Sequence, residues 1–161
     1  MEYARLGRSG LELSRLSFGS CVTFGFQLDD AAAMRCLAAA HDTGINFFDN
    51  AEVYAGGESE RIMGRVLRKL AWSRDTFCVS SKVHRGGDLP TQRGLHRNHV
   101  HDACHAALRR LEVDYLDLFF CHRPDLETPI EETVRAIDVL VRQGKVLYWG
   151  VPSPALVAKC W

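Results

Sequence analysis

The sequence lacks an excess of charge of either sign. Among its 161 residues, Lys and Arg together number 20, and Asp and Glu together also number 20. A domain that binds nucleic acid usually carries a basic patch or stripe that raises its overall positive charge. The balanced composition therefore does not favour nucleic acid as a partner.

The sequence also lacks a long apolar run. A membrane-spanning helix needs about 20 apolar residues, and residues 1–10, MEYARLGRSG, lack the apolar core of a signal peptide. Several of the cysteines lie in apolar segments, and none belongs to a paired framework: Cys21, Cys36, Cys78, Cys104, Cys121 and Cys160. This pattern predicts buried, reduced thiols. We therefore expect a cytoplasmic protein without membrane insertion.

Two phosphate-binding motifs are missing as well. The glycines of FGSCVTFG (18–25) do not have the G-x-G-x-x-G spacing that follows the first strand of a dinucleotide-binding fold. Gly56 and Gly57 lack the Lys-Ser/Thr pair of a P-loop, and they predict instead a turn before a helix capped near Ser59. The chain has no fixed-period repeat, low-complexity tract or internal linker, so we expect a single domain over 1–161.

What the chain does contain is a regular alternation of strand-like and helix-like segments. A short hairpin is predicted around residues 7–10. The predicted strands are 15–20, 45–50, 76–82, 114–122 and 145–151, and the predicted helices are 29–41, 58–70, 98–111 and 129–142. This alternation favours parallel strands joined by right-handed crossovers, in a doubly wound sheet or a βα barrel. Because the dinucleotide motif is absent and a full barrel needs about 250 residues, we expect an α/β fold made of the N-terminal five βα strands of a TIM (β/α)8 barrel, preceded by a small β-hairpin.

Three of the predicted strands end in an ionisable residue. Asp49, Lys82 and His122 each lie on the same face as the core residues that precede them, because side chains alternate along a strand. Taken singly, these residues also fit a turn former, a solvated lysine and a strand cap, and Tyr54 in the loop after the second strand fits a packing role. Barrel enzymes place catalytic groups at the carboxyl ends of the strands. The order of these residues therefore favours one shared site.

Several of these segments resemble the aldo-keto reductase superfamily, which consists of NADPH-dependent carbonyl reductases built on an eight-stranded βα barrel. The resemblance rests on GINFFDNAEVYAGGESE (44–60), SSK (80–82), HRPDLETPIEETVRAIDVLVRQGKVLYWG (122–150) and VTFGFQLDD (22–30). The last two stretches look most like the branch that contains the β-subunits of voltage-gated potassium channels and their bacterial relatives. The resemblance extends to about Gly150.

The resemblance implies a catalytic tetrad of Asp49, Tyr54, Lys82 and His122. Tyr54 would donate a proton to the carbonyl oxygen, Lys82 held by Asp49 would lower the pKa of the phenol, and His122 would orient the carbonyl. Contacts to NADPH/NADP are implied for Ser20, Cys21, Gln27, Asp49 and His122. Ser20 and Cys21 stand where the branch usually has Thr-Trp, and His122 stands where channel β-subunits commonly have Asn, which favours an enzyme.

The expected function is therefore NADPH-dependent reduction of a small aldehyde or ketone to an alcohol. Two alternatives remain: a truncated, non-catalytic fragment, and an NADPH-binding regulatory protein similar to channel β-subunits. The family pattern is lost after Gly150, where Pro152 replaces the expected serine and Ser153 is displaced. We expect from this that the native reading frame was longer. The open edges of a partial barrel would favour self-association.

A histidine cluster near the start of the third helix allows a further interpretation. His101 and His105 are four residues apart, a spacing that can hold a metal, with His96 and His99 close by in the sequence. No carboxylate or cysteine clearly completes such a site, although Cys104 is adjacent. We therefore predict no metal and favour a solvated helix start. The loop RGGDLPTQRG (85–94) resembles the variable loop beside the substrate mouth, and it fits a mobile surface loop equally well.

Overall fold

The centre of the molecule is a parallel sheet whose strands lie in the order of the sequence. The computed structural model describes residues 1–151. Its strands are β3 (Phe18–Gly19), β4 (Phe47–Asp49), β5 (Cys78–Val83), β6 (Leu116–Cys121) and β7 (Val146–Gly150). Each pairs in parallel with the next. A doubly wound sheet reverses its strand order at a switch point, whereas this sheet winds in one direction. The predicted partial TIM barrel is therefore confirmed.

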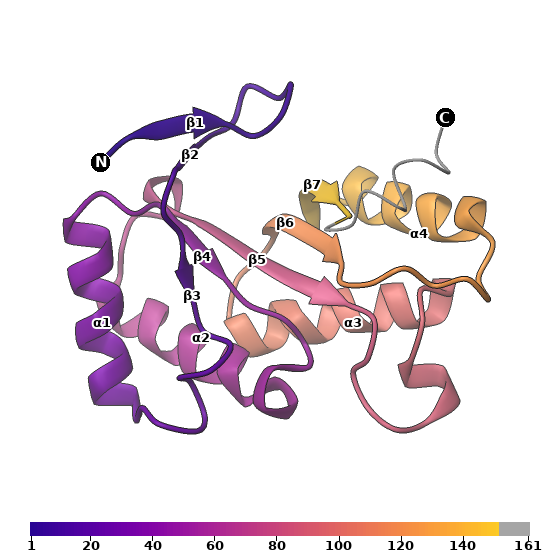
Figure 1. Cartoon of the computed structure of the whole chain (residues 1–161), viewed down its shortest axis with the longest axis horizontal. Helices are drawn as coiled ribbons and strands as arrows, with labels where there is room; N and C mark the ends of the chain where they lie inside the picture. The colour runs from indigo at the N-terminus through magenta and orange to yellow at the C-terminus, as the bar shows by residue number, and fades with distance from the viewer. Residues whose placement is uncertain (152–161) are drawn as a thin grey trace.

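Four helices connect these strands and follow one another around the sheet (Figure 1). They are α1 (Asp30–Asp42), α2 (Glu58–Leu70), α3 (Arg97–Leu111) and α4 (Ile130–Arg142). Consecutive helices pack against each other. The connections also contain the short 3₁₀ helices η1 (Tyr54–Gly57), η2 (Arg74–Thr76) and η3 (Pro90–Gln92).

The two faces of the sheet bury different sets of side chains. Phe48, Val79 and Phe119 face the helices and belong to the large core cluster, where all three are fully buried. Burying one such side chain stabilises the fold by about 1.5–3 kcal/mol. The opposite, inner face carries a smaller cluster that includes Cys78 and Leu118.

The predicted hairpin is confirmed, and it covers part of that inner face. It consists of β1 (Tyr3–Arg5) and β2 (Glu12–Ser14), which pair antiparallel. Leu13 of β2 packs with Cys78 and Leu118. Figure 1 shows the hairpin at the top, on the side of the sheet away from α2 and α3. It therefore supplies apolar cover at the amino ends of the strands and leaves their carboxyl ends uncovered.

The contact between α2 and α3 depends on a glycine. A Cβ atom on Gly64 would lie 2.6 Å from the carbonyl carbon of Leu111, much closer than a van der Waals contact allows.

The start of α2 differs from the prediction. Its N-cap is Gly57, which has a φ of 87°, and Ser59 is a buried residue inside the helix. The predicted cap near Ser59 is therefore wrong, because the left-handed glycine starts the helix two residues earlier.

Three remaining predictions concern thiols, membranes and the chain end. Cys78, Cys104 and Cys121 are buried as predicted, whereas Cys21 and Cys36 are exposed. Within residues 1–151, no helix combines the length and the apolar character needed to cross a membrane. Pro152 and Ser153 lie outside the described residues, so the single domain over 1–161 and the loss of the family pattern stay predictions.

Candidate functional site

The carboxyl ends of β4, β5 and β6 bring the predicted tetrad together. The parallel register places Asp49 opposite Ser80, and it places Lys82 opposite Phe120. His122 follows directly after β6, and its backbone N–H donates to the carbonyl of Val83 at 2.9 Å. Because parallel strands end at the same edge of a sheet, the side chains at these strand ends converge.

An ion pair forms the base of the site. Nζ of Lys82 lies 2.5 Å from Oδ2 of Asp49, and the hydroxyl of Ser80 donates to Oδ1 of Asp49 at 2.6 Å. The side chains of Lys82 and Asp49 are 11% and 24% exposed. Water therefore screens this pair much less than a surface ion pair.

All three N–H donors of the Lys82 ammonium have an acceptor within reach. One reaches Asp49, one reaches the carbonyl of Asn50 at 2.8 Å, and one reaches the hydroxyl oxygen of Tyr54 at 3.2 Å. An ammonium group cannot accept a hydrogen bond, so Tyr54 must be the acceptor in the last of these. The phenolic proton of Tyr54 is therefore left free for another partner.

Tyr54 lies between three other polar side chains of the site. Its ring meets that of His122 edge to face, with centroids 5.9 Å apart and an interplanar angle of 78°. The thiol of Cys21 lies beside this hydroxyl and contributes to the raised pKa of Tyr54. Sulfur is too weak an acceptor to hold the phenolic proton against an oxygen ligand.

The pKa of Tyr54 differs from the prediction. Burial is the main cause that raises it, with the negative charge of Asp49 and the contact with Cys21 adding to the effect, and the pKa reaches about 12. The predicted lowering of this pKa is therefore wrong for the protein without ligands, because burial, with the negative charge of Asp49 added, raises it. Burial and the positive charges of Lys82 and Arg123 lower the pKa of His122. At neutral pH both Tyr54 and His122 are thus uncharged.

An unusual backbone segment presents Tyr54 to the site. Ala55, Gly56 and Gly57 have φ values of 49°, 60° and 87°, which places three consecutive residues in the left-handed region. For alanine this conformation costs roughly 1–2 kcal/mol. A Cβ on Gly25 would lie 2.8 Å from Cβ of Ala55, so the turn over 21–28 packs tightly on this segment. That packing brings Cys21 to Tyr54.

The residues predicted to contact the cofactor fall into different environments. Ser20 is fully buried, and its hydroxyl donates to the carbonyl of Asp49 at 3.0 Å, which links β3 to β4. Cys21 is exposed next to Tyr54. Gln27 is exposed in the same turn, where its N–H donates to the carbonyl of Thr23 at 2.9 Å. The structure thus places Ser20 and Cys21 next to the tetrad, of which Asp49 and His122 are members.

The histidine cluster divides into two parts. The ring centroids of His101 and His105 on α3 lie 4.4 Å apart with an interplanar angle of 49°, and His101 bonds to Asp102. His99 is buried instead, beside Glu52. In the described part of the chain, no three His, Cys, Asp or Glu side chains are grouped so that they could hold a metal ion.

Sequence reasoning missed the role of Asn50, whose backbone carbonyl binds Lys82, and that of Glu52. A backbone contact such as that of Asn50 leaves no signal in residue type. Glu52 carried one weak signal: it is a second acid, between Asp49 and Tyr54 in the sequence.

A one-directional βα sheet with an acid, a phenol, an ammonium and an imidazole at its strand ends is the arrangement of part of a βα barrel with its polar site at the carboxyl ends of the strands. The chain belongs to the aldo/keto reductase family, whose model matches residues 15–159. Two relatives, from Arabidopsis thaliana and Oryza sativa subsp. japonica, are each described as "Probable voltage-gated potassium channel subunit beta". Each is 48% identical over 163 aligned residues, which cover 100% of this chain and 50% of the relative. The chain therefore spans about half the length of these relatives.

Proposed function

We propose that this chain carries the proton-donating site of an NADPH-dependent reductase that converts an aldehyde or a ketone to an alcohol. One observation carries the proposal: Lys82 uses its three donors on Asp49, Asn50 and Tyr54, so the phenolic proton of Tyr54 is free to be donated. The family membership of the chain supports the same chemistry.

The residues of the site fit the reacting end of a nicotinamide cofactor and a carbonyl substrate. Two neutral donors, the Tyr54 hydroxyl and the His122 imidazole, lie side by side at an open strand end. Ser20, Cys21, Gln27, Asp49 and His122 are the residues proposed to hold the cofactor. NADPH, when bound, would supply the hydride that adds to the carbonyl carbon.

In the proposed reaction, His122 donates a hydrogen bond to the carbonyl oxygen and orients it toward Tyr54. Tyr54 then transfers its proton to that oxygen, and a phenolate remains. The ammonium of Lys82, 3.2 Å from the phenol oxygen, stabilises this phenolate, while Asp49 keeps Lys82 in place. General acid catalysis of this kind typically accelerates a reaction about 10²–10⁴-fold.

The identity to relatives described as potassium channel β-subunits favours a second candidate function. Here the chain would bind NADPH as part of a regulatory protein, and turnover would be secondary. The proposed location is cytoplasmic in both cases, which a fluorescent fusion would test.

NADPH binding and turnover by the purified 161-residue chain distinguish these functions. Enhanced NADPH fluorescence on binding, together with aldehyde-dependent loss of absorbance at the wavelength of the reduced nicotinamide, would support the reductase. Tyr54→Phe should retain binding and lose turnover about 10²–10⁴-fold, because only the proton donor is removed. Binding without turnover would favour the regulatory candidate. No binding would overturn both and leave the non-catalytic fragment.

A further inference from the structure

A buried acid–histidine pair lies beside the tetrad and has no part in the proposed chemistry. Glu52, two residues before Tyr54, is 5% exposed, and His99 in the first turn of α3 is 4% exposed. Oε2 of Glu52 lies 3.3 Å from Nε2 of His99. The two residues are 47 positions apart in the sequence.

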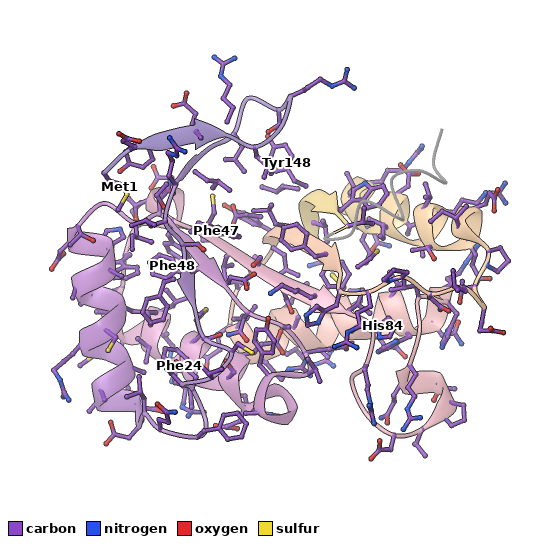
Figure 2. The ribbon with its side chains drawn as sticks, viewed as in Figure 1. Met1, Phe24, Phe47, Phe48, His84 and Tyr148 are labelled. Atoms are coloured by element: carbon purple, nitrogen blue, oxygen red, sulfur yellow. The ribbon has the colours of Figure 1, made fainter. Side chains whose placement is uncertain are left out.

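Glu52 continues the pairing of β4 and β5 beyond the point where β4 ends. Its backbone N–H donates to the carbonyl of Lys82 at 3.3 Å, and its Oε1 accepts the backbone N–H of His84 at 2.7 Å. Figure 2 shows His84 just past the arrowhead of β5. On the other side of β5, the carbonyl of Val83 accepts the N–H of His122. The strand end that carries Lys82 is thus held from both sides.

His99 forms a hydrogen bond with the C-terminal end of the loop over residues 84–94. Its Nδ1 lies 2.8 Å from the carbonyl of Gly94. Near the start of the same loop, a Cβ on Gly86 would come within 2.7 Å of Oε2 of Glu52, so the backbone packs directly on the pair. Glu52 therefore bonds to the start of this loop and His99 to its end, and the pair connects both ends to the segment that carries Tyr54.

The two contacts of His99 require an extra proton. A carbonyl oxygen and an ionised carboxylate only accept hydrogen bonds, whereas a neutral imidazole has one N–H to donate. His99 faces an acceptor with each ring nitrogen. Both contacts are satisfied only when an imidazolium faces a carboxylate, or when a neutral imidazole faces a protonated carboxyl group. Either state holds one proton more than a neutral histidine beside an ionised glutamate.

We infer that Glu52 and His99 are positioning residues that hold the carboxyl end of β5 and the 84–94 loop through one shared proton, and that losing this proton loosens both. The consequence for catalysis rests on the proposed function, because it acts through the alignment of Lys82 with Tyr54. The loosening itself does not depend on any activity.

The direction of titration agrees with this inference. Burial lowers the pKa of His99, but the hydrogen bond and the negative charge of Glu52 outweigh burial, and the pKa is raised above its usual value near 6.5. The other titratable groups around the pair are His84 in the loop, Glu60 on α2, and His96 and Asp102 on or next to α3. Because the pKa of His99 is higher in the folded protein than in the unfolded chain, the pair stabilises the fold fully below about pH 6.5. This stabilisation is lost as the pH rises through the folded-state pKa of His99.

Glu52→Gln is the informative variant. The amide oxygen can still accept the N–H of His84, and the amide nitrogen can donate to Nε2 of a neutral His99. This variant therefore keeps every hydrogen bond of the pair without the extra proton. Glu52→Ala removes the contacts to both His84 and His99 at every pH.

Amide hydrogen exchange of His84, measured by NMR from pH 5.5 to 9 and corrected for intrinsic exchange, tests the inference. In the unaltered 161-residue chain we expect its protection to fall about tenfold as His99 titrates, because one hydrogen-bonded contact is lost. Protection in Glu52→Gln should not change with pH over this range, and in Glu52→Ala it should be low throughout. If the unaltered chain shows no pH dependence, or if at pH 6 nitrogen shifts show a neutral His99 while the carboxyl carbon shift shows an ionised Glu52, the inference is wrong. The decision rests on Glu52→Gln even if Glu52→Ala does not fold.

These measurements need no cofactor, so they stand apart from the test of the proposed function. Where the chain is active, Glu52→Gln should retain kcat at a high pH at which the unaltered chain loses it. A change confined to the KM for NADPH would contradict positioning of Lys82.

Discussion

Replacing Asp49 by Asn leaves the ammonium of Lys82, whose side chain is 11% exposed, without its counter-ion. Its Nζ would keep the carbonyl of Asn50 and the hydroxyl of Tyr54 as acceptors, but both are neutral. Replacing Lys82 by Met has the converse effect, since Asp49 keeps only the hydroxyl of Ser80 as a donor. Replacing both residues removes both charges together. The three variants therefore form a double-mutant cycle on the ion pair.

The structure sets the size of the expected coupling. At the 2.5 Å separation of Nζ and Oδ2, an effective dielectric constant of about 20 gives a gross attraction of roughly 7 kcal/mol. Desolvation of the two ions offsets a large part of this attraction, and removing one partner of a fully buried pair costs about 3–5 kcal/mol. Because Asp49 is 24% exposed, we expect each single variant to lose about 3 kcal/mol of unfolding free energy. The double variant should also lose about 3 kcal/mol, which leaves a coupling of about 3 kcal/mol.

Urea unfolding at pH 7, followed by tryptophan fluorescence, measures these free energies. Asp88→Asn is the matched control, because Asp88 also pairs with a cation, Arg93, but its side chain is 87% exposed. We expect no measurable loss from this variant. Losses that add within about 0.5 kcal/mol in the Asp49–Lys82 cycle would refute the reasoning, since they would mean that the two charges do not interact at the site.

Three further predictions concern other parts of the molecule. Tyr54 should ionise near pH 12 rather than near the ordinary value of about 10. The difference between ultraviolet titrations of the unaltered chain and of Tyr54→Phe measures this pKa. Because the folded protein holds the phenolic proton more tightly than the unfolded chain, the unfolding free energy should fall as the pH rises from about 10 to about 12. Gly64→Ala should lower the unfolding free energy by about 1–3 kcal/mol in urea unfolding, because its Cβ would meet the backbone of Leu111; a gain, as helix propensity alone predicts, would contradict this. Trp149 is 39% exposed on β7, and within residues 1–151 this strand pairs only with β6. A charge on an open edge strand opposes pairing with another copy. If the chain self-associates through β7, Trp149→Lys should therefore lower its sedimentation coefficient.

The fold was predictable because its signals are local and repeated. The alternation of strands and helices predicts parallel pairing without any long-range information. Period two along each strand places Ser80 with Lys82 and, separately, Phe47 with Asp49. The parallel register then places Asp49 beside Ser80, so a shared site at the strand ends follows from the sequence. The predicted strand of 15–20 is shortened to Phe18–Gly19, because residues 15–16 form a bend after β2 and Ser20 leads into the turn that carries Cys21.

Properties that depend on several distant groups were not predictable in this way. The pKa of Tyr54 is raised by burial first and then by the negative charge of Asp49, and a sequence gives no distances from which to add these effects. The left-handed conformation of Ala55 is equally hidden, since alanine rarely adopts it. The partnership of Glu52 and His99 needs the folded loop between them before either residue has a reason to be buried.

Strand β5 explains why changes on the helical side of the sheet should reach the site. Ser80 and Lys82 face the tetrad, and Ser81, which lies between them, faces the helices. There its hydroxyl donates to Glu60, a fully buried acid that also accepts a hydrogen bond from Arg110 of α3 at 2.5 Å. Arg110 is the one cation bonded to that carboxyl group within residues 1–151, so removing it would leave the buried acid without a counter-ion and would destabilise its contact with Ser81. Since the position of Lys82 depends on the same short strand, the placement of its ammonium against Tyr54 is set by contacts on both faces of the sheet.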